Sequence, residues 1–181
     1  MKYFLASLCI LICNSVSYAQ SAETKAGPII NEYGQVFTVN EADLLLEKDK
    51  TYKVIFDVYT DDKKVSNMNP LINTVARFMN MHGQNGVPEE NMELVIVLHG
   101  AATKNALSDQ SYKKAYKRNN PNSGLMAALN EKNVKIYVCG QSLLSKGYHK
   151  EDVSEDVEVS LSALTALVKY QTEGYQLINF N

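Results

Sequence analysis

Apolar and polar residues follow one another along the chain in blocks that predict strands separated by helices. Five short blocks rich in β-branched, aromatic or aliphatic residues are expected to be strands: residues 52–59, 94–98, 134–138, 157–161 and 175–180. The block at 94–98 (LVIVL) is apolar at every position. Such a run is typical of a strand buried on both faces, as in a parallel sheet.

The segments between these blocks have the spacing of helices. Asn69 and Pro70 form a start signal, an N-cap followed by proline at the first helical position, and Gly83 is the expected stop. Apolar residues recur between them at helical spacing: Leu71, Val75, Phe78 and Met79. A second, weakly amphipathic helix is predicted over residues 102–118.

Two further helices are predicted nearer the C-terminus, one capped by Ser123 and one closed by Gly174. Their inward faces are expected to carry six apolar residues: Leu125, Met126, Leu129, Leu164, Leu167 and Val168. Strands that alternate with helical segments imply right-handed crossovers, and hence a mainly parallel sheet with helices on both faces. The fold class is therefore α/β, in one domain over residues 51–181.

The start of the chain has the pattern of a secretory signal peptide. Lys2 supplies a positive charge, residues 4–13 form an apolar run, and small residues precede a cleavage site after Ala19. The run is shorter than the roughly 20 residues that a membrane span needs. We therefore expect residues 1–19 to be a signal peptide and residues 20–50 a tether and arm. The protein is then exported, periplasmic or secreted, and free of the membrane after cleavage; an uncleaved anchor is the alternative.

Composition narrows the function classes. The 181 residues carry a net charge of -2, so no global basic field favours nucleic acid as a partner. Cys9 and Cys13 leave with the signal peptide, and Cys139 becomes the sole cysteine of the mature chain. A single cysteine excludes an internal disulfide framework, a Cys-x-x-Cys oxidoreductase and a structural zinc ribbon.

Candidate chemistry lies where the predicted strands end. In open α/β sheets ligands collect beyond the carboxyl ends of strands, where residues 57–60, His99 and Cys139 stand. A helical turn after Cys139 directs backbone N–H groups at the sulfur and favours the thiolate. His99 is the candidate base or hydrogen-bond donor beside it. The alternatives are a small buried cysteine that ends a strand and a histidine satisfied by nearby backbone.

Other kinds of site have little support in the sequence. His82 and His149 do not fall into a metal-ligand spacing with His99 or Cys139, so no metal is expected. No glycine-rich nucleotide motif is present, and no cofactor is expected. A basic cluster within residues 104–118 and an acidic stretch at 151–158 are expected to be solvated faces, or else patches that bring subunits together.

Residues 123–147, SGLMAALNEKNVKIYVCGQSLLSKG, resemble the DsrE/DsrF-like family of sulfur-relay proteins. The resemblance extends to Asn73 in the first helix, to VIVLHG at 95–100 and to LTALVKYQTEGYQLI at 164–178. It implies a three-layer α/β/α sandwich of flavodoxin-like topology and a homo-oligomer, a trimer or hexamer. Some members pass sulfur between proteins as a persulfide, and Cys139 is the matching position.

Two functions from different classes follow. The first is a sulfur carrier that holds a persulfide on Cys139, with Gly140, Gln141 and Asn73 as ligand-binding residues and a protein as sulfur donor or acceptor. The second is a non-catalytic oligomeric module that binds a small ligand or a protein. An exposed thiol favours the carrier and a sealed thiol favours the binding module. A redox sensor that caps its thiol reversibly also remains open.

Overall fold

The fold is built around one five-stranded parallel sheet. The computed structural model describes residues 23–62 and 64–180. The strands stand in the order β6-β5-β4-β3-β7, and every neighbouring pair is parallel. Their bounds are Tyr52–Val58 for β3, Met92–Leu98 for β4, Lys135–Cys139 for β5, Glu158–Ser160 for β6 and Gln176–Asn179 for β7. All five predicted strands are confirmed, with ends displaced by one or two residues.

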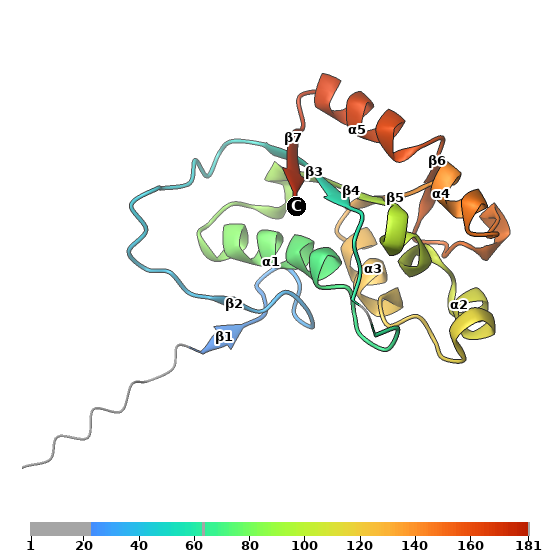
Figure 1. Ribbon diagram of the computed structural model, residues 1–181. Helices are drawn as coiled ribbons and strands as arrows, with labels where there is room; N and C mark the ends of the chain where they lie inside the picture. The colour runs from blue at the N-terminus through green and yellow to red at the C-terminus, as the bar shows by residue number, and fades with distance from the viewer. Residues whose placement is uncertain (1–22, 63, 181) are drawn as a thin grey trace, which may run out of the picture.

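Helices cover both faces of this sheet, which confirms the predicted three-layer sandwich. Figure 1 shows α1 and α3 below the sheet and α5 above it. The α-helices are α1 (Pro70–Gln84), α2 (Asp109–Tyr116), α3 (Ser123–Asn130), α4 (Gly140–Ser145) and α5 (Ala163–Thr172). Three short 3-10 helices join them: η1 (Glu89–Asn91), η2 (Gly100–Ala106) and η3 (Lys150–Asp152). Within the described residues, none of the helices combines the length and the apolar character needed to cross a membrane.

Helix α1 begins as predicted and ends slightly later. The Asn69 side chain accepts a hydrogen bond from the Leu71 N–H (2.9 Å), and Pro70 is the first helical residue. The predicted stop at Gly83 is wrong, because the helix runs on to Gln84. A Cβ on Gly83 would lie 2.9 Å from the Ile29 side chain, so this glycine makes room for the N-terminal arm.

The single helix predicted over residues 102–118 is instead two helices, η2 and α2. Leu107 separates them: it is fully buried and forms an isolated antiparallel bridge with Val153. Ser108 then starts α2, because its side chain accepts a hydrogen bond from the Ser111 N–H (3.3 Å). Tertiary pairing and a new N-cap therefore break a segment whose weak amphipathic pattern did not show the break.

Helix α3 lies as predicted, apart from its cap. The N-cap is Asn122, and Ser123 is the first helical residue, with its hydroxyl donating to Asp109 Oδ1 (2.8 Å). The three predicted inward residues are buried: Leu125, Met126 and Leu129.

Helix α5 turns a different face to the sheet from the one its leucines predict. Leu164 is 77% exposed and Val168 is 64% exposed, while Leu167 is only partly buried. The residues that pack on the sheet are Ala163, Ala166 and Tyr170. Small alanines allow the helix to lie close to the strands, so the larger aliphatic side chains point to solvent.

The N-terminal arm is fastened to α1 by two asparagines. It contains a short antiparallel pair, β1 (Thr24–Lys25) with β2 (Val36–Phe37). Buried Asn80 accepts from the Ile30 N–H (2.9 Å) and donates to three arm carbonyls: Ile30, Tyr33 and Gly34. Asn73 accepts from the Gly34 N–H (3.0 Å). The expected signal peptide, residues 1–19, lies outside the described residues.

Candidate functional site

Cys139 lies where the connections that follow two adjacent strands go to opposite faces of the sheet. It is the last residue of β5 and the N-cap of α4. The segment after β5 packs with the α1 side, because Leu143 belongs to that core. The segment after the neighbouring strand β6 crosses to the other face, where Ala163 packs. Open α/β sheets bind their ligands at the carboxyl edge where such a crossing occurs.

Hydrogen-bond donors from two helix starts converge on the sulfur. The Ser142 N–H donates to Cys139 Sγ at 3.4 Å. Burial raises the pKa of the thiol, but hydrogen bonds from the Ser142 side chain and from the backbone N–H groups of Ser142, Ala163 and Gln141 outweigh it, so the pKa is lowered. Gln141 and Ser142 belong to α4, and Ala163 opens α5. The protein therefore stabilises a negative charge on this sulfur.

The sulfur is closed off from solvent in the single chain. Cys139 is 5% exposed. The turn between β6 and α5 lies against it: a Cβ on Gly140 would meet the Ser160 carbonyl oxygen at 2.8 Å and the Leu161 carbonyl oxygen at 3.4 Å. Glycine at 140 thus permits this turn to approach closely. Closure of the thiol favours a binding module, whereas the converging donors favour sulfur chemistry.

His99 follows the neighbouring strand β4, whose Leu98 pairs with Val138 of β5. Its ring nitrogen Nε2 lies 2.7 Å from Asp57 Oδ1 at the end of β3. The next residue, Gly100, donates its N–H to Ser142 Oγ at 3.4 Å and so links the end of β4 to α4. Asp57, His99 and Cys139 therefore occupy the carboxyl ends of three adjacent strands, in the order β3, β4, β5.

Of the other predicted site residues, two lie beside the sulfur and one contacts the N-terminal arm. Gly140 and Gln141 open α4 beside the sulfur, with the Gln141 side chain exposed. Asn73 is engaged with the arm through Gly34, as described above. The sequence led us to expect backbone N–H groups of residues 140–142 at the sulfur, but it did not single out the Ser142 hydroxyl, although a side chain three residues beyond a capping residue has the spacing to reach it.

Within residues 23–62 and 64–180, no three side chains of His, Cys, Asp or Glu lie close enough together to hold a metal ion.

A parallel α/β sandwich with a helix-capping cysteine at its carboxyl edge defines the class of this protein. A sequence profile of the DsrE/DsrF-like family matches residues 53–180, and the chain belongs to that family. The match covers the five-stranded sheet from the second residue of β3 to the end of β7 and leaves the N-terminal arm outside.

Two solved structures have the same fold. The first is a protein of unknown function, MTH1491, from Methanobacterium thermoautotrophicum, with 24% identity and a TM-score of 0.54 over 71% of this chain and 99% of that one. The second is the ychN protein from E. coli, with 16% identity and a TM-score of 0.54 over 72% of this chain and 100% of that one. None of the curated proteins compared matches the sequence. Likeness at these identities establishes the fold alone.

Proposed function

We propose that this protein is a sulfur carrier that holds sulfur as a persulfide on Cys139. The observation that carries the proposal is the convergence of N–H donors from α4 and α5 on Sγ, which lowers the pKa of the thiol. A persulfide anion has the same charge and gains from the same donors. Membership of a family with a sulfur-relay fold agrees with this chemistry.

The transfer step needs no external oxidant. The Cys139 thiolate attacks the terminal sulfur of a donor persulfide, R–S–SH. The new S–S bond forms as the old one breaks, so Cys139 becomes Cys–S–SH and the donor leaves as the thiolate R–S⁻. Release to an acceptor thiolate is the same step in reverse, with Cys139 as the leaving group.

The His99–Asp57 pair is suited to manage the thiol proton. The Asp57 carboxylate accepts a hydrogen bond from Nε2–H, and in the neutral ring this tautomer leaves Nδ1 as an acceptor. In the proposal His99 takes the Cys139 proton when the turn between β6 and α5 opens. Opening of this turn is required in any case, because only 5% of Cys139 is exposed.

We also propose that the chain acts as a homo-oligomer, a trimer or hexamer, and exchanges sulfur with a protein partner outside the cytoplasm. Three exposed aliphatic residues follow one another on the outer side of α5 and the turn before it: Leu161 (71%), Leu164 (77%) and Val168 (64%). Apolar patches of this kind mark protein interfaces. Leu164→Asp should reduce the light-scattering mass toward one chain, and an unchanged mass would exclude this face from self-association.

A second function is favoured by the closed thiol itself. If Cys139 serves only to fill the core, the protein is a binding module whose apolar α5 face recognises its partner. The two functions differ in what Cys139→Ser does. For a carrier it abolishes sulfur uptake and leaves partner binding intact, whereas a binding module has no uptake to lose.

The experiment uses a chain with Cys9→Ser and Cys13→Ser, so that Cys139 is the sole thiol. Inorganic polysulfide is the donor, and the intact mass is read before and after reductant. The proposal expects one added sulfur atom per chain, removed by reductant and absent from Cys139→Ser. A folded protein that takes up no sulfur, with Cys139→Ser unfolding, would show that Cys139 is a packing residue.

A further inference from the structure

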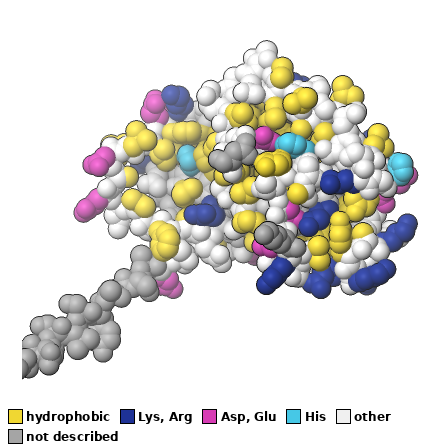
Figure 2. All heavy atoms as spheres, in the orientation of Figure 1, with side chains coloured by type: hydrophobic (Ala, Val, Ile, Leu, Met, Phe, Trp, Pro, Cys, Tyr) yellow, Lys and Arg dark blue, Asp and Glu magenta, His cyan; other side chains and the backbone are white. Residues whose placement is uncertain are grey.

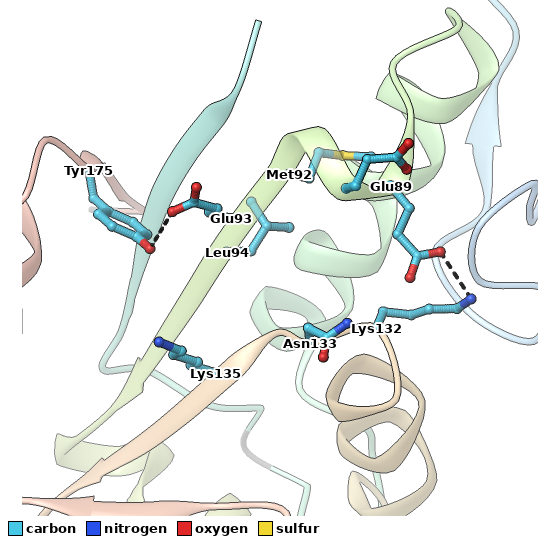
Figure 3. A pocket seen from close by; sticks show the side chains of 9 residues that line it. Glu89, Met92, Glu93, Leu94, Lys132, Asn133, Lys135 and Tyr175 are labelled. Carbon is cyan, nitrogen blue, oxygen red and sulfur yellow. Dashed lines mark hydrogen bonds and ion pairs between the residues drawn. The ribbon is translucent and has the colours of Figure 1, made fainter. Parts of the chain in front are cut away.

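A hollow of about 480 Å³ lies at the amino edge of the sheet, at the opposite end of the strands from Cys139. It is framed by η1 and the start of β4, by the turn that leads into β5, and by Tyr175 just before β7 (Figure 3). Its volume lies in the range of small-molecule sites. The floor is apolar, because Met92 and Leu94 line it and are 6% and 2% exposed.

One wall of the hollow contains a paired carboxylate and an additional lysine. Glu93 pairs with Lys53 (3.1 Å) and accepts a hydrogen bond from the Tyr175 hydroxyl (3.0 Å). The hydrogen bond from Lys53 lowers the pKa of Glu93 against the opposing effect of burial, so this carboxylate stays charged. Lys135 stands on the same side and has no salt-bridge partner among the described residues. Lys53, just outside the hollow, already pairs with Glu93, so Lys135 adds a positive charge to this wall that no salt bridge balances.

The opposite wall carries the reverse imbalance. Lys132 pairs with Glu89 at 3.1 Å, as the dashed line in Figure 3 shows. Glu90 also lines the hollow and has no salt-bridge partner in the described chain. Two carboxylates on this side face one ammonium group. The hollow thus combines an apolar floor with an unpaired cation on one side and an unpaired anion on the other.

We propose that this hollow binds a small zwitterion, a short peptide with free ends, whose carboxylate meets Lys135, whose ammonium meets Glu90 and whose apolar side chain lies on Met92 and Leu94. A singly charged ligand satisfies one wall and leaves the other unpaired. A neutral ligand leaves both charges unpaired. The site is separate from Cys139 and does not depend on the proposed sulfur chemistry.

The test is a titration of the protein with the dipeptide Ala-Leu, followed by backbone amide shifts in NMR. Saturable shifts are expected at the start of β4 and of β5. N-acetyl-Ala-Leu lacks the ammonium and Ala-Leu amide lacks the carboxylate, so each should bind about two- to fivefold more weakly, as for a partly exposed ion pair.

Charge-removing variants identify the two walls. Lys135→Met should weaken binding of Ala-Leu and of its N-acetyl form but leave the amide form unchanged. Glu90→Gln should weaken Ala-Leu and the amide form but leave the N-acetyl form unchanged. Lys150→Met, at an exposed lysine of η3, is the matched control and should change none of them. Absence of saturable shifts at this edge, or equal affinity for all three ligands, would overturn the proposal.

Discussion

The two faces of the sheet differ in how they are covered. The face under α1 and α3 is a continuous apolar core that includes Phe56, Ile72 and Leu129, all without exposed surface. The face under α5 has a much smaller cluster, in which alanines and tyrosines replace long aliphatic side chains. Space-filling Figure 2 shows apolar side chains reaching the surface on the α5 side as well as elsewhere.

The thinly covered face also carries the polar chemistry. Side chains alternate along a strand, so Cys139 shares the α5 face with Tyr137, and Glu93 shares it with Val95. Both the cysteine at the carboxyl edge and the charged wall at the amino edge are thus built on one side of the sheet. The α5 side thus holds Cys139, Glu93 and exposed aliphatic side chains, whereas the floor of the hollow, Met92 and Leu94, belongs to the α1-side core.

The largest expected difference comes from one substitution made on each side. Leu129→Ala removes a fully buried side chain from the α1 face and should lower the free energy of unfolding by about 2–5 kcal/mol. Leu164→Ala removes a side chain that is 77% exposed and should change it by about 0.5 kcal/mol or less. Urea unfolding of both variants at low protein concentration measures the contrast. Equal losses would show that α5 is as deeply packed as α3.

The second-largest loss of stability is expected when Asn80, which bonds the N-terminal arm, is replaced. Asn80→Ala leaves the backbone groups of Ile30 and Gly34 without their buried partner, at a cost of about 2–3 kcal/mol. Hydrogen exchange of the arm amides should accelerate in the same variant. Asn130→Ala is the control, because Asn130 is exposed and the one described hydrogen bond of its side chain goes to Asp156. A stable variant with protected arm amides would contradict the anchoring role.

On the α5 face, removing one hydrogen-bond donor should make the Cys139 thiolate less stable. Ser142→Ala deletes the hydroxyl that bonds Cys139 and keeps the backbone N–H at 3.4 Å. The pKa of the Cys139 thiol should therefore rise, and the thiolate fraction at neutral pH should fall severalfold. Ser145→Ala, whose hydroxyl donates to the Ser142 carbonyl, is the control in the same helix. The pH dependence of thiolate absorbance reports the difference.

The smallest effect is a pH dependence on the α1 face. Burial lowers the pKa of His82 from 6.5, against the hydrogen bond to the Phe78 carbonyl. As pH falls, the unfolded chain therefore binds this proton at a higher pH than the folded chain does. Stability is lost as pH falls below about 6.5. Unfolding of wild type and His82→Gln across this range should show a weaker slope in the variant. An identical slope would assign the acid sensitivity to other groups.

Local pattern was sufficient for the sheet and for α1, because a buried strand and a capped amphipathic helix are each encoded by neighbouring residues. It failed for α5, where Leu164 and Val168 have the spacing of a core stripe but face solvent. Periodicity reports which residues share a face of a helix and not what that face meets. A helix that buries alanines against a sheet and aliphatic residues against a partner has the same pattern as one turned the other way.

The candidate site was only partly predictable for a similar reason. Cys139 and His99 could be placed at strand ends because parallel strands end at one edge. The bond between His99 and Asp57 depends on the register of β3 against β4, and the closure of Cys139 depends on the turn after β6. Both are set by tertiary structure, between residues far apart in the sequence.

The proposed function depends on a folded protein that stabilises the anionic form of Cys139 relative to the unfolded chain. The most direct test is the pKa of its thiol, measured by thiolate absorbance in the folded chain and again in denaturant, with Cys9 and Cys13 replaced by serine. The pKa of the thiol should be lower in the folded protein, because donors from α4 and α5 outweigh burial. A folded-state pKa equal to or above that of the unfolded chain would contradict it.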